Sequence, residues 1–197
     1  MGRNNPSPSK VSLLERVSDE NQYYRINEFV RDARNITKML LPASETVDKL
    51  RPLLSRLVAD SMSRAILGRD LGRDADPIVY SAPDLYIEFV SWKHGDSTPI
   101  HNHNTWVLIA GITGNECNVN YRRLDDGSAP WHARVVEQNI VDILPGVCAS
   151  ILPPNDIHAV AIPNSRTTAL HVYGTNLSKE WRYQFNIETG EVAPLRK

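Results

Sequence analysis

Two histidines separated by one residue, His101 and His103, have a type and spacing that could do chemistry. Side chains in a β-strand alternate between its two faces, so imidazoles at positions i and i+2 point the same way. Such a pair can hold a single metal ion from a rigid backbone, because neutral imidazole is the commonest metal ligand in proteins. The spacing therefore predicts a metal site on a strand, against the alternative of two unrelated histidines on the surface or in the core.

The residues around the pair favour the metal site. An apolar run over Val107–Ile112 continues from it, and the glycines of Gly111–Gly114 end that run with a turn. A third histidine, His158, follows a second turn cluster and begins another predicted strand, so we expect the three imidazoles to converge on one ion. Imidazole suits zinc, copper, iron and nickel, so the ligand type does not name the metal.

A carboxylate ligand is a further question for this site. Iron sites open to substrate commonly combine two histidines with one carboxylate. The positions four and five residues past His103 are Val107 and Leu108, which cannot bind a metal, so an iron ion here would sit in a three-histidine site. Glu116 is the nearest acid downstream. It stays open as an additional ligand, against the alternative of a polar residue at a strand end.

Composition excludes several classes of protein. The chain has 197 residues, long enough for one good core, and a formal net charge of −1, which provides no field to attract the phosphates of nucleic acid. Its two cysteines and the absence of an apolar N-terminal run predict a reduced, cytoplasmic protein. Its apolar runs are far shorter than a membrane span. We expect no nucleic-acid or membrane partner, and a monomer or small homo-oligomer.

The first third of the chain has the pattern of helices, and these must support the site. Apolar residues recur there at three-to-four spacing, and Pro42 separates two of the helical stretches. The predicted elements are a disordered lead-in (1–10), a helix from the Ser12–Glu15 capping box through Tyr23–Val30, a helix over Ser44–Asp60, a short helix over Ser61–Leu67 and a connector over Gly68–Asp76. We expect residues 11–76 to pack on a second domain, residues 77–197.

The second domain has the pattern of an all-β structure. Short β-branched and aromatic segments are separated by turns at intervals typical of an antiparallel sandwich or small barrel. The predicted strands are Ile78–Tyr80, Leu85–Trp92, Thr105–Ile112, Glu116–Arg122, Ala133–Gln138, Val147–Leu152, His158–Ile162, Thr167–Tyr173 and Trp181–Ile187. No helices alternate with these strands, so a parallel α/β fold is disfavoured.

Several motifs together resemble a known family over roughly residues 78–190. They are a strand ending in Trp92, the Gly95…Thr98-Pro99 turn, His101-Asn-His103-Asn-Thr-Trp106, Gly114-Asn-Glu116, Asp156-Ile157-His158 and Ala169-Leu-His171-Val-Tyr173-Gly174. This set is similar to the bacterial thiol dioxygenases of the cupin superfamily, the cysteine and 3-mercaptopropionate dioxygenases. Those are non-haem Fe(II) enzymes that oxidise a small thiol carboxylic acid to its sulfinic acid with O2.

The resemblance implies a mainly β fold, a cupin jelly-roll (double-stranded β-helix) barrel with an N-terminal α-helical segment. It also implies site residues: the ligands of Fe(2+) are His101, His103 and His158, the catalytic pair is His171 and Tyr173, and the substrate carboxylate is bound by Arg182. These roles are physically reasonable. A guanidinium holds a carboxylate with two parallel hydrogen bonds, and a histidine two residues from a tyrosine can orient its hydroxyl.

The sequence departs from the family pattern in two places that concern the substrate. Ala169 stands where the family has the serine of a Ser-His-Tyr relay, so the relay is either shortened or completed by Thr168 or a water molecule. The strand near Ile78–Tyr80 should carry a second polar substrate contact, for which only Arg73 and Asp76 are nearby. The resemblance places 3-mercaptopropionate slightly ahead of cysteine as substrate.

Two alternatives to a thiol dioxygenase remain. One is a three-histidine cupin dioxygenase that acts on a non-thiol substrate such as a diketone or a flavonol, in which Arg182 need not face the pocket. The other is a non-catalytic cupin that binds a small ligand, which the missing serine and the missing second contact would suit. A metal ion saturated by protein ligands would favour the latter.

Overall fold

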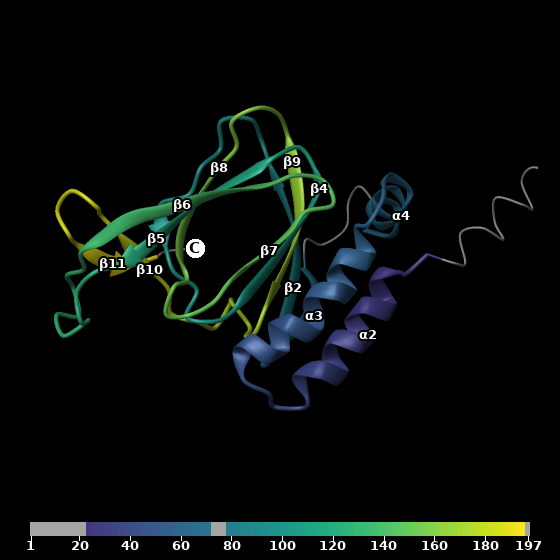
Figure 1. Ribbon diagram of the computed structural model, residues 1–197, viewed down its shortest axis with the longest axis horizontal. Helices are drawn as coiled ribbons and strands as arrows, with labels where there is room; N and C mark the ends of the chain where they lie inside the picture. Colours follow the sequence, from purple (N-terminus) through teal and green to yellow (C-terminus); the bar gives the residue numbers. More distant parts are fainter. Residues whose placement is uncertain (1–22, 72–77, 196–197) are drawn as a thin grey trace, which may run out of the picture.

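The computed structural model describes residues 23–71 and 78–195, and two antiparallel β-sheets dominate it (Figure 1). The helices are α2 (Ile26–Thr37), α3 (Ala43–Leu57) and α4 (Ser61–Leu71). The strands are β1 (Ile78–Ala82), β2 (Leu85–Trp92), β3 (Ile100–His101), β4 (Val107–Thr113), β5 (Glu116–Arg123), β6 (Val135–Ile143), β7 (Cys148–Ile151), β8 (Ile157–Ala161), β9 (Thr167–Tyr173), β10 (Tyr183–Phe185) and β11 (Val192–Pro194).

The order of the strands is that of a jelly roll. The five-stranded sheet runs β1-β2-β9-β4-β7, and the six-stranded sheet runs β11-β10-β3-β8-β5-β6. Within them, strands β2 to β9 form two four-stranded sheets, β2-β9-β4-β7 and β3-β8-β5-β6, with every pair antiparallel. An eight-stranded, two-sheet arrangement of this kind is the double-stranded β-helix. The prediction of a mainly β jelly roll preceded by helices is confirmed.

The predicted strands agree closely with the observed ones. β2 and β9 have the predicted bounds, and the other seven predicted strands overlap β1, β4, β5, β6, β7, β8 and β10. The sequence does not predict β11, because three residues carry too little alternation to be recognised. β3 corresponds to the strand expected to carry His101 and His103, but it is only two residues long.

The alternation of side chains on β2 and β9 directs some residues to the helices and others into the barrel. Leu170 and Val172 of β9 belong to the apolar cluster shared with the helices. Ala169 and Tyr173 face the opposite way and belong to the cluster between the sheets. His171 lies between those two positions on the same face, so β9 presents His171 and Tyr173 to the barrel interior.

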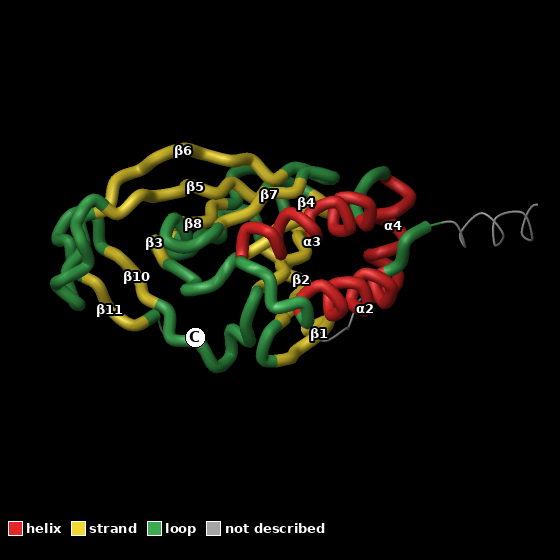
Figure 2. Tube along the Cα trace, turned by 60° about the horizontal axis from the view of Figure 1, so that its bottom comes forward, coloured by secondary structure: helices red, strands yellow, loops and turns green. Residues whose placement is uncertain are grey.

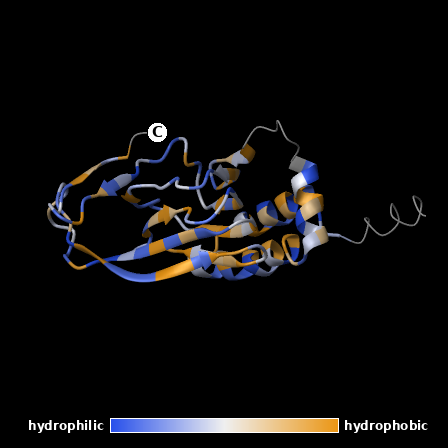
Figure 3. Cartoon of the chain, turned by 90° about the horizontal axis from the view of Figure 1, so that it is seen from above, coloured by the Kyte–Doolittle hydropathy of each residue, from blue (hydrophilic) through white to orange (hydrophobic). Residues whose placement is uncertain are grey.

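Helices α2 and α3 cover the outer face of the five-stranded sheet, where hydrophobic residues gather (Figures 2 and 3). Helix α2 begins at Ile26, where the Glu28 carboxylate accepts the Arg25 backbone N–H, so the prediction that the helix includes Tyr23 is wrong. Helix α4 continues to Leu71, past the predicted end at Leu67. None of the described helices is long and apolar enough to cross a membrane. The predicted lead-in, the Ser12–Glu15 capping box and the boundary near residue 76 lie outside the described residues.

The close contact of Gly174 with Trp106 gives a stability prediction. A Cβ atom at position 174 would lie 2.2 Å from Nε1 and 2.5 Å from Cε2 of the buried Trp106 indole. Because the interior cannot absorb such an overlap without moving the ring, we expect Gly174→Ala to destabilise the fold by about 1–3 kcal/mol. Urea unfolding measures this loss. Gly68→Ala, where a Cβ meets nothing within 4 Å, serves as the control and should not lower stability. Equal stability of Gly174→Ala and wild type would contradict the contact.

Candidate metal centre

Three histidines from separate parts of the chain meet inside the barrel. His101 of β3, His103 and His158 of β8 each offer one ligand atom, and these atoms lie within 4.8 Å of one another. The ring centroids of His101 and His158 are 4.6 Å apart, and those of His103 and His158 are 5.0 Å apart. His101 and His158 are direct neighbours across the β3–β8 pairing. The convergence predicted from the spacing is therefore observed.

The structure corrects how the first two histidines are held. Strand β3 ends at His101, so the prediction that His101 and His103 share one strand is wrong. The chain turns after His101, and Asn104 has a left-handed φ of 55°. Asp156 fixes this turn, because its Oδ2 accepts the backbone N–H of His103 at 3.0 Å and of Asn104 at 2.7 Å. The turn brings the imidazole of His103 to the other two.

The hydrogen bonds of the cluster suit a bound cation. His101 Nδ1 lies 2.9 Å from the carbonyl oxygen of Pro99, and His158 Nδ1 lies 2.7 Å from Asn118 Oδ1. Since both partners are oxygens, these nitrogens carry the hydrogen and leave the lone pairs on the Nε2 atoms. His158 Nε2 and His103 Nδ1 are buried without a partner among the described residues. A buried lone pair is costly when nothing binds it, so this donor set fits a metal ion.

Burial keeps the three imidazoles neutral. It lowers the pKa of His101 from 6.5 to about 4 and lowers the pKa values of His103 and His158 well below 6.5. The positive charge of Arg182 lowers all three further. Neutral imidazole is the form that binds a metal, so the site is ready to do so at neutral pH.

These shifts predict that the metal-free protein is less stable in mild acid. Between about pH 6.5 and pH 4 the unfolded chain binds protons at these histidines and the folded chain does not, so the free energy of unfolding falls as the pH falls. His171, whose pKa is raised, opposes this, but it is one group against three. The urea midpoint of chelator-treated protein should therefore decrease from about pH 7 to about pH 5. His94→Gln, which alters an exposed histidine, should keep this dependence. A midpoint that is constant or rises in acid would contradict it.

A pocket of about 230 Å³ opens beside the cluster. Its lining includes all three histidines together with Glu88, His171, Tyr173 and Arg182. No side chain of residues 23–71 and 78–195 forms a hydrogen bond or ion pair with the guanidinium of Arg182. The six site residues that the resemblance implies thus border one cavity, and a cationic group there is free to meet an anion.

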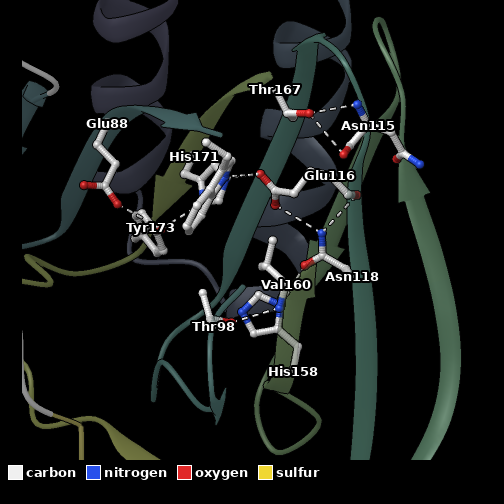
Figure 4. A network of polar contacts seen from close by, with 11 residues as sticks. Glu88, Thr98, Asn115, Glu116, Asn118, His158, Val160, Thr167, His171 and Tyr173 are labelled. Atoms are coloured by element: carbon white, nitrogen blue, oxygen red, sulfur yellow. Dashed lines mark hydrogen bonds and ion pairs between the residues drawn. The ribbon is translucent and has the colours of Figure 1, made fainter. Parts of the chain in front are cut away.

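A chain of hydrogen bonds runs from the wall of the pocket across the barrel to Glu116 (Figure 4). Tyr173 OH lies 3.0 Å from His171 Nδ1 and donates to Glu88 Oε1 at 3.1 Å. His171 Nε2 lies 3.0 Å from Glu116 Oε2. When Tyr173 donates to Glu88, both nitrogens of His171 must carry hydrogen, so His171 is an imidazolium. Burial alone would lower the pKa of His171, but the Glu116 carboxylate outweighs it and raises that pKa.

This chain answers two questions that the sequence left open. Glu116 is not in the three-histidine group, so its interpretation as a metal ligand is wrong. It completes the relay on His171 instead. Thr168 does not, because it lies on the other face of β9 and bonds to Thr113. The predicted second polar contact near Ile78–Tyr80 is absent among the described residues of the pocket, which has Glu88 of β2 in its lining.

Four residues of the site were missed as such by sequence reasoning. They are Glu88, Asn118 and Asp156, and also Glu116 in its role as a partner of His171. A polar residue at every second position of β5, beginning at Glu116, is the pattern that could have drawn attention to that strand. Arg73 and Asp76, the candidates for the second substrate contact, lie outside the described residues.

No protein-family profile matches the chain. Among solved structures, it is similar to the DMSP lyase DddQ from Ruegeria pomeroyi DSS-3, at 16% identity and a TM-score of 0.38 over 55% of this chain and 46% of that one. A cupin superfamily protein from Desulfitobacterium hafniense DCB-2 gives 14% identity and a TM-score of 0.38 over 57% and 87%. A cupin 2 conserved barrel domain protein from Leptotrichia buccalis gives 20% and 0.36 over 50% and 39%. The chain spans less than half of the length of the first and third.

Likenesses at this level of identity and TM-score do not show an activity. The strand order of the two sheets supports the fold by itself, and the three imidazoles support a metal site by their convergence and their unpartnered nitrogens. The chain is therefore a jelly-roll (double-stranded β-helix) protein, with a buried group of three histidines in its barrel that is compatible with a metal ion.

Proposed function

We propose that this protein is a non-haem Fe(II) dioxygenase that oxidises a small thiol carboxylic acid to its sulfinic acid. The observation that carries the proposal is the shared lining of one cavity. The three-histidine group, the Arg182 guanidinium, which has no side-chain partner among the described residues, and the Tyr173 hydroxyl all border the same 230 Å³. A thiol acid offers a thiolate for the metal site and a carboxylate for the guanidinium, and the Tyr173 hydroxyl lies at the wall of the same pocket.

The size and charge of the pocket support a small anionic substrate. Pockets for drug-sized ligands are generally larger, from about 300 Å³ upward. Arg182 has donors arranged as a fork that matches a carboxylate. Holding the carboxylate there would fix where the sulfur lies relative to the histidines, and fixed geometry of reacting groups can supply a large share of a rate enhancement.

The reaction balances without an organic cofactor. A thiol RSH and one O2 give one sulfinic acid RSO2H, in which both oxygen atoms end on sulfur and the sulfur supplies the electrons. His101, His103 and His158 would hold the metal ion, which would supply the site for thiolate and O2. The residues of the chain bind and orient the substrate and exclude water. Tyr173, held between His171 and Glu88, keeps one proton at the wall of the pocket.

Glu88 favours a thiol acid that also carries an amine. Its carboxylate lines the pocket that contains the Arg182 guanidinium, so the cavity presents an anionic group as well as a cationic one. The ammonium and the carboxylate of an amino acid thiol would match both. 3-Mercaptopropionate has no amine and would use Arg182 alone. We therefore place a cysteine-like substrate ahead of it, as the reverse of the order that the resemblance implies.

Oxygen uptake by iron-loaded protein tests the proposal. We expect uptake that depends on a thiol acid and yields one sulfinate per O2, measured with an oxygen electrode and mass spectrometry. Cysteine should give a higher kcat/KM than 3-mercaptopropionate, because only cysteine uses both charges. No uptake with any thiol acid would remove the proposal. Uptake with a diketone or a flavonol instead would favour the non-thiol dioxygenase. The expected cytoplasmic location and the monomeric or small homo-oligomeric state remain predictions.

A further inference from the structure

Glu116 is a buried carboxylate that contacts the pocket walls from behind without lining the pocket. It is fully buried at the start of β5, yet three donors reach it. Its Oε2 accepts from Trp92 Nε1 and from His171 Nε2, each at 3.0 Å, and its Oε1 accepts from Asn118 Nδ2 at 3.1 Å. Burial alone would raise the pKa of Glu116, but His171 and the other donors lower it, so the carboxylate is ionised. A buried anion with three donors is a fixed point in the barrel.

The charge of Glu116 determines which way the amide of Asn118 points. An ionised carboxylate only accepts hydrogen bonds, so Asn118 must turn its NH2 group toward it (Figure 4). The opposite end of the amide, Oδ1, then faces His158 Nδ1 at 2.7 Å. An oxygen at that distance requires a hydrogen on Nδ1. The Nε2 atom of His158 then carries no hydrogen, and its lone pair faces the cluster. This atom is buried and without a partner among the described residues.

We propose that Glu116 is a positioning residue that sets the hydrogen placement on two imidazoles of the site, on His171 directly and on His158 through Asn118. One carboxylate thereby joins the two sheets, because His171 lies on β9 and His158 on β8. It aims Nδ1 of His171 at Tyr173 and keeps the metal-facing nitrogen of His158 free of hydrogen. The inference rests on the proposed function only for the metal ion at His158, and it involves no turnover.

Glu116→Gln should reverse the direction of the hydrogen bonds that run from residue 116 through Asn118 to His158. The oxygen of glutamine is needed by the two donors Trp92 and His171, so its NH2 group faces Asn118. The Asn118 amide must then rotate to present its oxygen, and its own NH2 group meets His158 Nδ1. That nitrogen becomes the acceptor, and the hydrogen moves to Nε2, where it opposes metal binding. We expect Co2+ affinity to fall about 10- to 100-fold, as for loss of an outer partner of a metal-bound histidine.

Adding Asn118→Asp should restore the original direction of these hydrogen bonds. In the double variant E116Q/N118D, the NH2 group of residue 116 donates to the carboxylate at residue 118, and that carboxylate accepts from His158 Nδ1. The total charge of the pair equals that of wild type. We expect the Nδ1–H tautomer to return and Co2+ affinity to recover to within about threefold. A role in packing alone predicts no such recovery.

Two measurements read this out without enzyme activity. Imidazole nitrogen shifts in NMR spectra of the metal-free protein report the tautomer of His158, and titration with Co2+ followed by visible absorption reports affinity. Glu137→Gln and Asn139→Asp, at the same spacing on exposed positions of β6, are matched controls and should resemble wild type. The inference is overturned if E116Q keeps both the Nδ1–H tautomer and wild-type affinity, or if the double variant recovers neither.

The design separates this inference from the proposed function. If wild-type protein does not bind Co2+, the metal site and the proposed function fail. The tautomer of His158, compared between wild type and E116Q by NMR, still tests the role of Glu116. If E116Q does not fold, Asn118→Asp alone provides the test. It keeps an oxygen opposite His158 Nδ1, so the Nδ1–H tautomer is expected, and a change to Nε2–H would overturn the inference.

Discussion

His158→Gln is expected to weaken metal binding severely while leaving the fold in place. His158 is 2% exposed and is the member of the cluster that pairs across β3 and β8 with His101. Glutamine has a similar length and can still donate to Asn118 Oδ1, so no buried acceptor is left unpaired. The substitution removes one of the three imidazoles that would bind the ion. This should weaken metal binding more than loss of a hydrogen-bond partner of a metal-bound histidine does. We expect Co2+ affinity to fall by more than about 100-fold, measured by visible absorption and by metal content after dialysis.

The control for this variant is His94→Gln. His94 is exposed, and its ring nitrogen lies 3.1 Å from the carbonyl oxygen of Pro163. It is not a member of the three-histidine group. It should bind Co2+ as wild type does. Retention of wild-type affinity in His158→Gln would show that residue 158 is not a ligand, and the proposed oxygenase would lose its metal centre.

The sequence predicted the convergence of the histidines for partly the wrong reason. Alternation along a strand correctly places His171 and Tyr173 on one face of β9, because that strand is seven residues long and paired on both sides. The same argument fails for His103, since β3 ends at His101. The position of His103 depends on Asp156, which is 53 residues away and accepts two backbone N–H groups. Local periodicity has no information on such a contact.

The relay of hydrogen bonds illustrates a second limit. The resemblance to the thiol dioxygenases indicates that Ala169 stands where a serine was expected, but not what acts in its place. Glu116 reaches His171 from the other sheet, across the barrel, and a strand-end glutamate gives no local sign of this. Glu88 is likewise recognisable only once β2 and β9 are paired, because that pairing sets Glu88 opposite His171. The local sequence pattern predicts where strands lie. It does not predict which side chains of the two sheets meet, because those contacts depend on the fold.

Arg182→Gln is expected to raise the KM for thiol carboxylic acids strongly and to change kcat much less. The guanidinium lines the metal pocket and is free among the described residues, so its proposed partner is the substrate carboxylate. Loss of one member of a buried charge pair costs about 2–5 kcal/mol, which is about 30-fold or more in binding. Steady-state oxygen uptake with cysteine and 3-mercaptopropionate measures KM, and Co2+ titration shows whether the metal site is intact.

Two controls distinguish binding of the substrate carboxylate by Arg182 from an effect on the whole pocket. One is a substrate without a carboxylate, and the other is a variant at an exposed arginine. Cysteamine has the thiol and the amine but no carboxylate, so its KM should be the same in Arg182→Gln and in wild type. Arg122→Gln, at an exposed position of β5, should leave the KM of all three thiols unchanged. An equal rise of KM for cysteamine and cysteine would mean that Arg182 acts on the pocket as a whole. The carboxylate assignment would then fail, although the metal centre would stand, because the three histidines do not depend on Arg182 for their placement.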